Sequence, residues 1–230
     1  MRRGGDQDVP RPEVVAEGAP PPWAELSPDA RSVALHEVAA RVAARGPGRP
    51  WLRPGGQVLV PGARASAVLV ALYEERDEPV VILTKRAATL RVQPGHISFP
   101  GGREDPGETA VQTALREAHE ETGLDPSLPR VVGELDHLAT IGTGALIVPV
   151  VAQLPSGRPR LVPAAAEVEA VLHVPLSELM DDGVYREELW GERPLQRPVW
   201  FFDLEGETVW GATAAMLRNL LLVAAGLDGV

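Results

Sequence analysis

The chain has 230 residues, a length that suits one domain with extensions and can bury a sizeable core. Its 22 basic and 32 acidic residues give a formal charge of −10, so we expect neither nucleic acid nor an anionic membrane as the main partner. Cysteine is absent, which excludes disulfides, thiol nucleophiles and zinc–thiolate sites, and no apolar run has the length of a signal peptide or a membrane span. We therefore expect a cytoplasmic protein.

The N-terminal quarter of the chain differs in composition from the rest. Residues 1–25 are rich in proline, glycine and charge, and we predict a flexible segment there. Ser27-Pro28-Asp29 is typical of a helix start, and the helix is predicted to continue from Val33 to Ala44. Residues 46–62 hold many glycines and prolines and read as a connector. The predicted organisation is thus a flexible segment (1–25), a helix with its connector (26–62) and a main domain (63–226).

The main domain alternates strand-like and helical patterns. A charged turn at 75–78 separates two apolar strands, and a loop over 87–95 leads to a short strand. The predicted strands are 64–75, 79–86, 96–99, 130–140, 146–154, 167–173, 198–203 and 208–210, and the predicted helices are 108–121, 175–179 and 213–225. Strands with helices between and after them indicate an α/β fold with a mixed sheet.

The helix predicted from Glu108 to Glu121 carries an unusual arrangement of charge. At about 100° per residue, Glu117 and Glu121 fall at the edge of its apolar stripe and form an i,i+4 pair of like charge. Only Glu120 has a favourable helical partner, Arg116. A divalent cation such as Mg²⁺ would remove the conflict, since hard cations prefer carboxylate oxygens. A solvated acidic helix face is the alternative interpretation.

The spacing of glycine, glutamate and arginine residues in and before this helix helps to decide between a metal site and a solvated acidic face. The stretch 102–124 fits the pattern G, five residues, E, seven residues, R-E-aliphatic-x-E-E-x-G-aliphatic without a gap, through Gly102, Glu108, Arg116, Glu117, Glu120, Glu121 and Gly123. It resembles the box of the Nudix hydrolases. That resemblance implies an α/β/α sandwich with a mixed β-sheet and hydrolysis of a phosphoanhydride in a nucleoside diphosphate linked to another group.

The resemblance also implies metal ligands. Glu117 and Glu121 would bind Mg²⁺ or Mn²⁺, and Glu120 and the carbonyl of Gly102 would complete one or more sites. Glu108 would support the metals through water.

Two further roles concern proton transfer and orientation. Arg116 would orient a glutamate by charge-assisted hydrogen bonding. The general base differs among branches of the family, so Glu120, Glu117 and Glu167 are all candidates. Glu167 has a second interpretation, a strand-edge acid with no catalytic role.

The residues upstream of the box resemble one branch of the family, the coenzyme A pyrophosphatases. The resemblance runs through Ile82 to Ala87, Arg91, Gly95 and the sequence Phe99-Pro100-Gly101-Gly102. This chain has Ile82 where leucine is usual, Gln93 where histidine is frequent, and His96 where an amide or acid is frequent. Residues 208–214 also resemble the C-terminal element of this branch.

Three positively charged or polar residues near the box are candidates for substrate binding. Arg86 and Arg91 could hold phosphate through forked donors, or could be ordinary surface arginines. His96 could donate a hydrogen bond to phosphate, or could be a polar strand residue.

These observations lead to three functional hypotheses. The first is a coenzyme A or acyl-coenzyme A pyrophosphatase that forms a phosphopantetheine product and adenosine 3′,5′-bisphosphate. The second is a Nudix enzyme acting on ADP-ribose, a dinucleotide or a modified nucleotide. The third is a non-catalytic binding module, which the intact glutamates disfavour. In each case the partner is a small nucleoside-diphosphate-type molecule, and a homodimer is compatible with all three.

Overall fold

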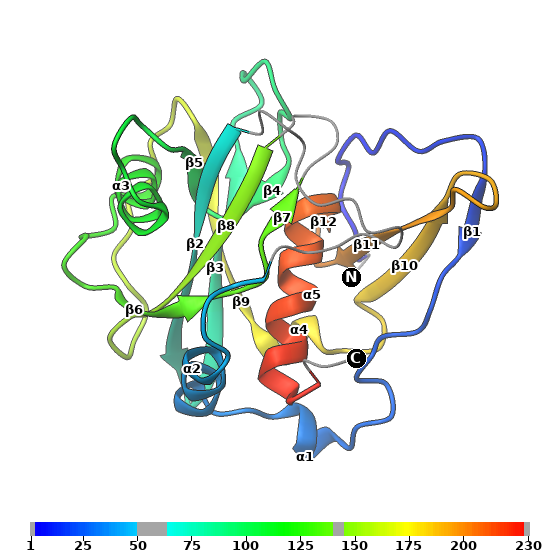
Figure 1. The fold of residues 1–230 in the computed structure, drawn as a ribbon, viewed down its shortest axis with the longest axis horizontal. Coiled ribbons are helices and arrows are strands. Elements are labelled where there is room, and N and C mark those ends of the chain that lie inside the picture. Colours follow the sequence, from blue (N-terminus) through cyan, green and yellow to red (C-terminus); the bar gives the residue numbers. More distant parts are fainter. Residues whose placement is uncertain (1–2, 50–63, 140–144, 228–230) are drawn as a thin grey trace.

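The computed structural model describes residues 3–49, 64–139 and 145–227. Most of the predicted connector, residues 50–62, lies outside this part of the chain. The described residues form two sheets with helices between and outside them (Figure 1). Their bounds are β1 Val15–Glu17, α1 Pro28–Arg31, α2 Leu35–Ala44, β2 Arg64–Glu75, β3 Glu78–Arg86, β4 Ile97–Ser98, β5 Gly101–Arg103, α3 Ala110–Thr122, β6 Arg130–Glu134, β7 Leu138–Ala139, β8 Ala145–Gln153, β9 Val168–Pro175, α4 Leu176–Leu179, β10 Tyr185–Trp190, β11 Arg197–Asp203, β12 Thr208–Trp210 and α5 Gly211–Ala225.

The larger sheet is mixed, as the sequence predicts. β2 runs parallel to β8, and every other pairing in this sheet is antiparallel. β2 and β3 form a hairpin whose two-residue turn, Arg76 and Asp77, has positive φ angles of 55° and 63°. They pair only next to this turn, over Leu72–Glu75 and Glu78–Val81.

Beyond the hairpin β2 and β3 diverge, which leaves a gap in the sheet. The segment 97–103 enters between the two diverging strands, with β4 paired to β3 and β5 paired to β2. The turn between β4 and β5 contains Phe99 and Pro100, both buried. The bare backbone of Gly101 and Gly102 is thereby fixed inside the sheet.

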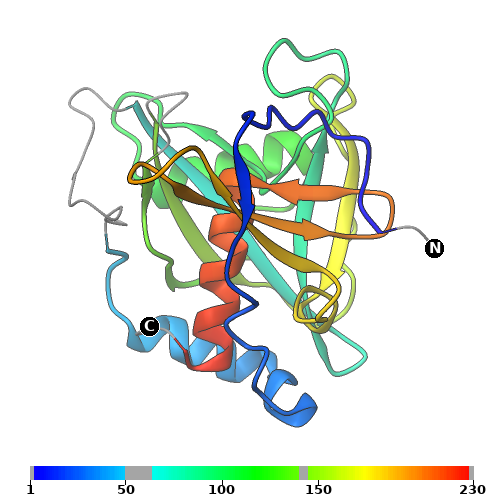
Figure 2. The same ribbon diagram turned by 90° about the vertical axis from the view of Figure 1, so that its right-hand side faces the viewer.

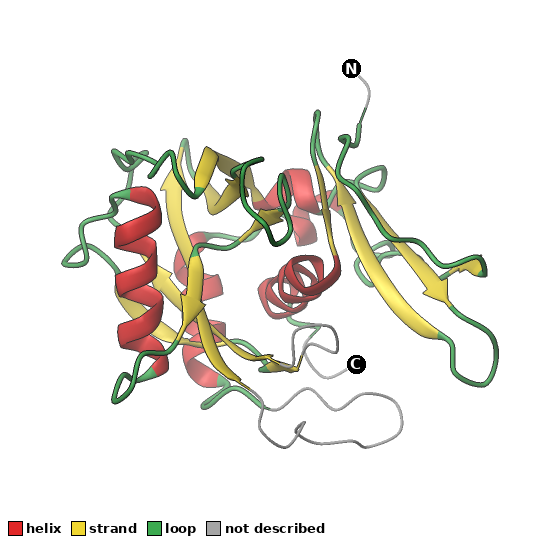
Figure 3. Cartoon of the chain, turned by 90° about the horizontal axis from the view of Figure 1, so that it is seen from above, coloured by secondary structure: helices red, strands yellow, loops and turns green. Residues whose placement is uncertain are grey.

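Helices cover both faces of the larger sheet, as seen from above in Figure 3. α3 packs on one face, over a cluster that includes Leu69, Ile82 and Val150. α2 and α5 pack on the other face, over a cluster that includes Val70, Leu83 and Val151. The predicted α/β fold with a mixed sheet is therefore confirmed.

A second sheet lies on the far side of α5. Its strand order is β1-β10-β11-β12, all antiparallel, and it stands to the right of α5 in Figure 1. α5 is buried almost all round because it lies between the two sheets, which explains a helix that is apolar on nearly every side. The sequence predicts β11 and β12 but not the sheet as a unit.

The N-terminal segment differs from the flexible tail that its composition predicts. β1 pairs with β10, and the side chain of Trp23 is fully buried in the core, where its indole N–H donates to the carbonyl of Met180. The predicted helix over 27–44 is two helices, because Ala34 is extended and begins α2. A three-residue strand has no period to detect, and its partner strand is more than 160 residues away.

None of the helices in the described part of the chain combines the length and the apolar composition that crossing a bilayer requires.

Candidate active site

α3 presents the glutamates, and both of its ends are fixed by capping. Thr109 caps the first turn in a capping box with Gln112, and Gly123 ends the helix in the left-handed conformation at φ 67°. The packed face of α3 lies on β2 and β5, so the glutamates at the edge of that face meet the backbone of the opening in the sheet.

Glu117 and Glu121 contact the two glycines of β5. Glu121 is only 4% exposed, and one of its carboxylate oxygens accepts a hydrogen bond from the Gly101 amide at 3.2 Å. The carboxylate of Glu117 lies so close to Gly102 that a Cβ at this glycine would collide with it. The Gly102 backbone and the two carboxylates are therefore brought together, as required for the predicted metal ligands.

Arg116 holds the outer side of this cluster. Its Nε and Nη2 donate to both oxygens of Glu108 at 2.8 and 3.0 Å, and its Nη1 donates to Glu117 at 2.9 Å and to Glu120 at 3.0 Å. Nη2 also reaches the carbonyl of Arg103 at 3.1 Å. The predicted pairing with Glu120 is present, but the forked interaction is made with Glu108.

Glu108 is committed to local hydrogen bonds. Besides Arg116, its carboxylate accepts from the Thr113 hydroxyl at 2.7 Å and from the Asp105 amide at 3.1 Å. Hydrogen bonding, chiefly from Arg116, lowers the pKa of Glu108 to about 2. The contribution of Thr113 was not anticipated, because a threonine inside a helix has no distinctive pattern. Glu108 thus anchors Arg116, and any role towards a metal stays a prediction.

The inner carboxylates are held where charge is unfavourable. Burial raises the pKa of Glu121 to about 7, with a further contribution from the charges of Glu117 and Glu167. Burial also raises the pKa of Glu117, although Arg116 opposes that rise. A concentration of partly desolvated negative charge at bare backbone is the environment that a divalent cation stabilises.

Glu167 reaches the same cluster from a different part of the chain. The segment before β9 is tied to the end of α3, since the Ala164 amide donates to the carbonyl of Glu121 at 2.9 Å and the Val162 amide to that of Thr122 at 2.8 Å. Glu167 is exposed, and its charge raises the pKa of both Glu117 and Glu121. The structure thus brings Glu167 to the predicted site; its role as a base stays a prediction.

Arg86, the last residue of β3, lies near Glu121. Its charge lowers the pKa of Glu121, opposing the effect of burial. Within the described residues its Nε is buried and has no hydrogen-bond acceptor. An unpaired buried donor is costly, and the positive charge of this guanidinium would favour an anionic ligand beside Glu121.

The other two candidate substrate residues lie farther from the glutamates. Arg91 is exposed on the loop 87–95, and its side chain makes no hydrogen bond or ion pair with the described residues. The His96 imidazole packs against Trp210, with ring centroids 5.4 Å apart. Burial lowers the pKa of His96. Their contact with substrate stays a prediction.

The donor set fits a hard divalent cation, although no group of three His, Asp or Glu side chains in the described residues already has the arrangement of a metal centre. Arg116 holds Glu117 and Glu120 through one carboxylate oxygen each, so both keep a second oxygen as a potential ligand. Glu121, Glu117, Glu120 and the Gly102 carbonyl supply only oxygen donors, which is the preference of Mg²⁺ and Mn²⁺.

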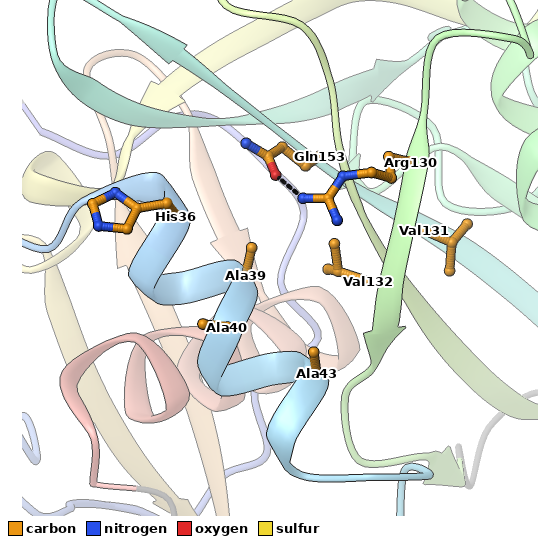
Figure 4. Close-up of a pocket in the computed structure, with 8 residues that line it drawn as sticks. All are labelled: His36, Ala39, Ala40, Ala43, Arg130, Val131, Val132 and Gln153. Atoms are coloured by element: carbon orange, nitrogen blue, oxygen red, sulfur yellow. Dashed lines mark hydrogen bonds between the residues drawn. The ribbon is translucent and has the colours of Figure 1, made fainter.

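A separate hollow lies between α2 and the β6 edge of the larger sheet (Figure 4). Its volume is about 450 Å³, and it is lined by small and apolar side chains together with His36 and the hydrogen-bonded pair Arg130 and Gln153. It contains no carboxylate, so we do not place the chemistry there.

Comparison with known proteins agrees with the geometry. Residues 63–194 match the model of the NUDIX domain. The chain is 36% identical over 170 residues to the uncharacterized Nudix hydrolase NudL of Photorhabdus laumondii, covering 74% of this chain and 89% of the relative. It is also 36% identical over 160 residues to NudL of Escherichia coli K12, covering 69% and 82% of the two chains. A MutT/nudix family protein from Enterococcus faecalis superposes with a TM-score of 0.46 at 14% identity over 76% of this chain and 71% of that one. On the strength of the domain match and the sequence relatives, this chain belongs to the Nudix hydrolase family.

Proposed function

We propose that this Nudix hydrolase cleaves the pyrophosphate bond of coenzyme A or an acyl-coenzyme A, forming a phosphopantetheine product and adenosine 3′,5′-bisphosphate. The observation that carries the proposal is the position of Arg86: its charge acts on the carboxylate of Glu121, and its buried Nε has no hydrogen-bond acceptor among the described residues. Arg86 belongs to the upstream segment that resembles the coenzyme A pyrophosphatases. A substrate with a pyrophosphate and a separate 3′-phosphate needs such a cationic donor in addition to metal ions.

In this proposal Glu117, Glu121, Glu120 and the Gly102 carbonyl would hold Mg²⁺ or Mn²⁺. When bound, such a cation neutralises phosphate charge and lowers the pKa of a water molecule. Arg116 keeps the carboxylates of Glu117 and Glu120 oriented through its hydrogen bonds at 2.9 and 3.0 Å.

The chemical step is hydrolysis. The oxygen of water forms a bond to one phosphorus of the pyrophosphate, and the bond between that phosphorus and the bridging oxygen breaks. The proton of the water passes to a carboxylate. Glu120 and Glu167 are the exposed candidates, while Glu117 is the candidate closest to the Gly102 backbone.

A product analysis tests the proposal. The protein is incubated with Mg²⁺ and coenzyme A, ADP-ribose or NADH in parallel, and the products are separated and identified by mass spectrometry. We expect equal amounts of phosphopantetheine and adenosine 3′,5′-bisphosphate from coenzyme A. Glu121→Gln should abolish their formation, whereas Glu192→Gln, the same charge change in the exposed β10–β11 turn, should not.

The other outcomes distinguish the alternatives. Intact coenzyme A together with cleaved ADP-ribose or NADH would move the protein to another Nudix substrate. If none of the three is cleaved, a binding module becomes the better interpretation.

Two arginine variants test the substrate contacts separately. Arg86→Ala should raise KM for coenzyme A by about tenfold or more, since a charge-assisted hydrogen bond is worth roughly 1.5–3 kcal/mol. Arg91→Ala reports whether the exposed loop arginine takes part, and an unchanged KM would remove it from the phosphate site.

A further inference from the structure

Residues 3–11 form a strap across the edge of the second sheet, here called the N-terminal strap. Figure 2 shows it running from the N-terminus past the loop 87–96 towards β1. The strap lies outside residues 63–194, the part of the chain that matches the family model. Its contacts with the rest of the chain therefore need their own explanation.

The β11–β12 hairpin holds the beginning of the strap. The Gly4 amide donates to the Leu204 carbonyl at 2.7 Å, and the Gly5 amide donates to the Thr208 hydroxyl at 3.0 Å. A Cβ at Gly5 would lie 2.5 Å from the carbonyl oxygen of Gly206 and close to the backbone of the next residue. The strap thus approaches the hairpin so closely that only glycine fits at position 5.

The outer face of the second sheet holds the end of the strap. Val9 packs against the cluster of Trp190, Val199 and Phe201. Arg11 forms an ion pair with Glu188 at 2.9 Å. These contacts fix the strap on both sides of Gln7 and Asp8.

Gln7 and Asp8 are the strap residues that reach the loop 87–96. The Gln7 side chain accepts from the Thr208 amide at 2.8 Å and donates to the Gly95 carbonyl at 3.4 Å and to Glu207. The backbone of Asp8 lies close enough to the His96 imidazole to oppose the effect of burial on its pKa. The side-chain amide of Gln7 therefore bridges the β11–β12 hairpin and the loop.

The same loop residues are paired with Arg86. The Gly95 amide donates to the Arg86 carbonyl at 3.1 Å, and the Arg86 amide donates to the His96 carbonyl at 2.9 Å. Any displacement of Gly95 and His96 is consequently transmitted to the backbone of Arg86, whose side chain lies beside Glu121.

We propose that the N-terminal strap, through Gln7, positions the base of the loop 87–96 and thereby the guanidinium of Arg86 for the phosphate of the substrate. Gln7 is a positioning residue, because it acts through Gly95 and Arg86. The inference deepens the proposed function and rests on it for the substrate. The mechanical part, that the strap holds the loop, does not depend on which substrate is used.

Hydrogen exchange tests the mechanical part without substrate. In Gln7→Ala the amides of Arg86 and Gly95 should exchange several times faster than in the wild type, while the melting temperature stays the same. Gln196→Ala, a matched change in the β10–β11 turn, should leave both amides unchanged. Gly5→Ala is a second route to the same loss, because its Cβ displaces the strap from the hairpin. Unaltered exchange at both amides in Gln7→Ala and Gly5→Ala would overturn the proposal.

Kinetics tests the consequence for the substrate. Gln7→Ala should raise KM for coenzyme A by about twofold to tenfold, the range that follows from one net hydrogen bond, with kcat within about twofold of the wild type. A fall in kcat at unchanged KM would contradict a positioning role. If the wild type leaves coenzyme A intact, the proposed function fails, and the exchange result alone decides whether the strap holds the loop.

Discussion

Glu121→Gln should make the protein more stable when no divalent cation is present. The carboxylate of Glu121 is 4% exposed and accepts one hydrogen bond, from Gly101. Its pKa rises from 4.5 to about 7 on folding, chiefly because of burial. The ionised carboxylate therefore destabilises the fold, and a glutamine of the same shape removes that charge.

The size of the effect follows from the pKa. Each pH unit between folded and unfolded pKa values corresponds to about 1.4 kcal/mol, so ionised Glu121 costs about 3 kcal/mol in the fold. The new amide N–H group needs an acceptor, which offsets about 1 kcal/mol. We expect a net gain of about 2 kcal/mol, or roughly 4–8 °C in melting temperature for a chain of this size.

The stabilisation of the fold by Glu121→Gln depends on pH. A carboxyl group with a raised pKa in the fold favours folding below the unfolded pKa, and that contribution is lost as the pH rises from 4.5 through about 7. The advantage of Glu121→Gln should therefore be full at pH 8 and absent at pH 4. Thermal unfolding by circular dichroism in EDTA at both pH values measures it.

Two comparisons make this experiment decisive. Glu120→Gln changes the same charge at a side chain that is 56% exposed, and we expect little change in the metal-free melting temperature. Mg²⁺ should raise the melting temperature of the wild type and have less effect on Glu121→Gln. A lower melting temperature for Glu121→Gln than for the wild type at pH 8 would refute the burial reasoning.

Four other substitutions should distinguish residues that serve the site from residues that serve the fold. Gly102→Ala should lower turnover at least tenfold with little loss of stability, because its Cβ displaces only the end of the Glu117 side chain. Gly101→Ala should instead lower the melting temperature, since its Cβ would lie 2.6 Å from the backbone of Val68. Arg116→Lys should lower both turnover and the melting temperature, because an ammonium cannot make the forked interaction with Glu108. Equal activity and stability would argue against the network. His173 is hydrogen-bonded to Tyr73 at 2.9 Å, and burial is the main reason that its pKa is lowered to about 4. The stability of the wild type should therefore fall as the pH drops from 6.5 to about 4, and this fall should be missing in His173→Gln. Acid unfolding measures both proteins, and identical pH profiles would contradict the role of His173.

The local features of the box could be predicted from sequence because they depend on short-range periodicity. The angular position of Glu117 and Glu121 on the helix predicted their place at the edge of the packed face, and Gly123 predicted the helix end. The partner of Arg116 was only partly predicted. Glu108 lies before the first helical turn and folds back to Arg116, which helical spacing cannot indicate.

The long-range parts of the fold have no comparable signal. β5 begins with Gly101 and Gly102, which have low strand propensity, and it forms because β2 and β3 diverge and leave their edges unpaired. β10 alternates weakly and needs β11 and β1 on either side. The N-terminal strap has a disordered composition, yet Gly5 and Gln7 bind a residue of the β11–β12 hairpin that lies 203 and 201 residues away in the chain.

The most direct measurement compares kcat/KM for coenzyme A, ADP-ribose and NADH, each with Mg²⁺ and with EDTA. We predict the highest value for coenzyme A, by at least about tenfold, and its loss in EDTA. A higher value for ADP-ribose or NADH, or turnover of coenzyme A that persists in EDTA, would contradict the proposed function.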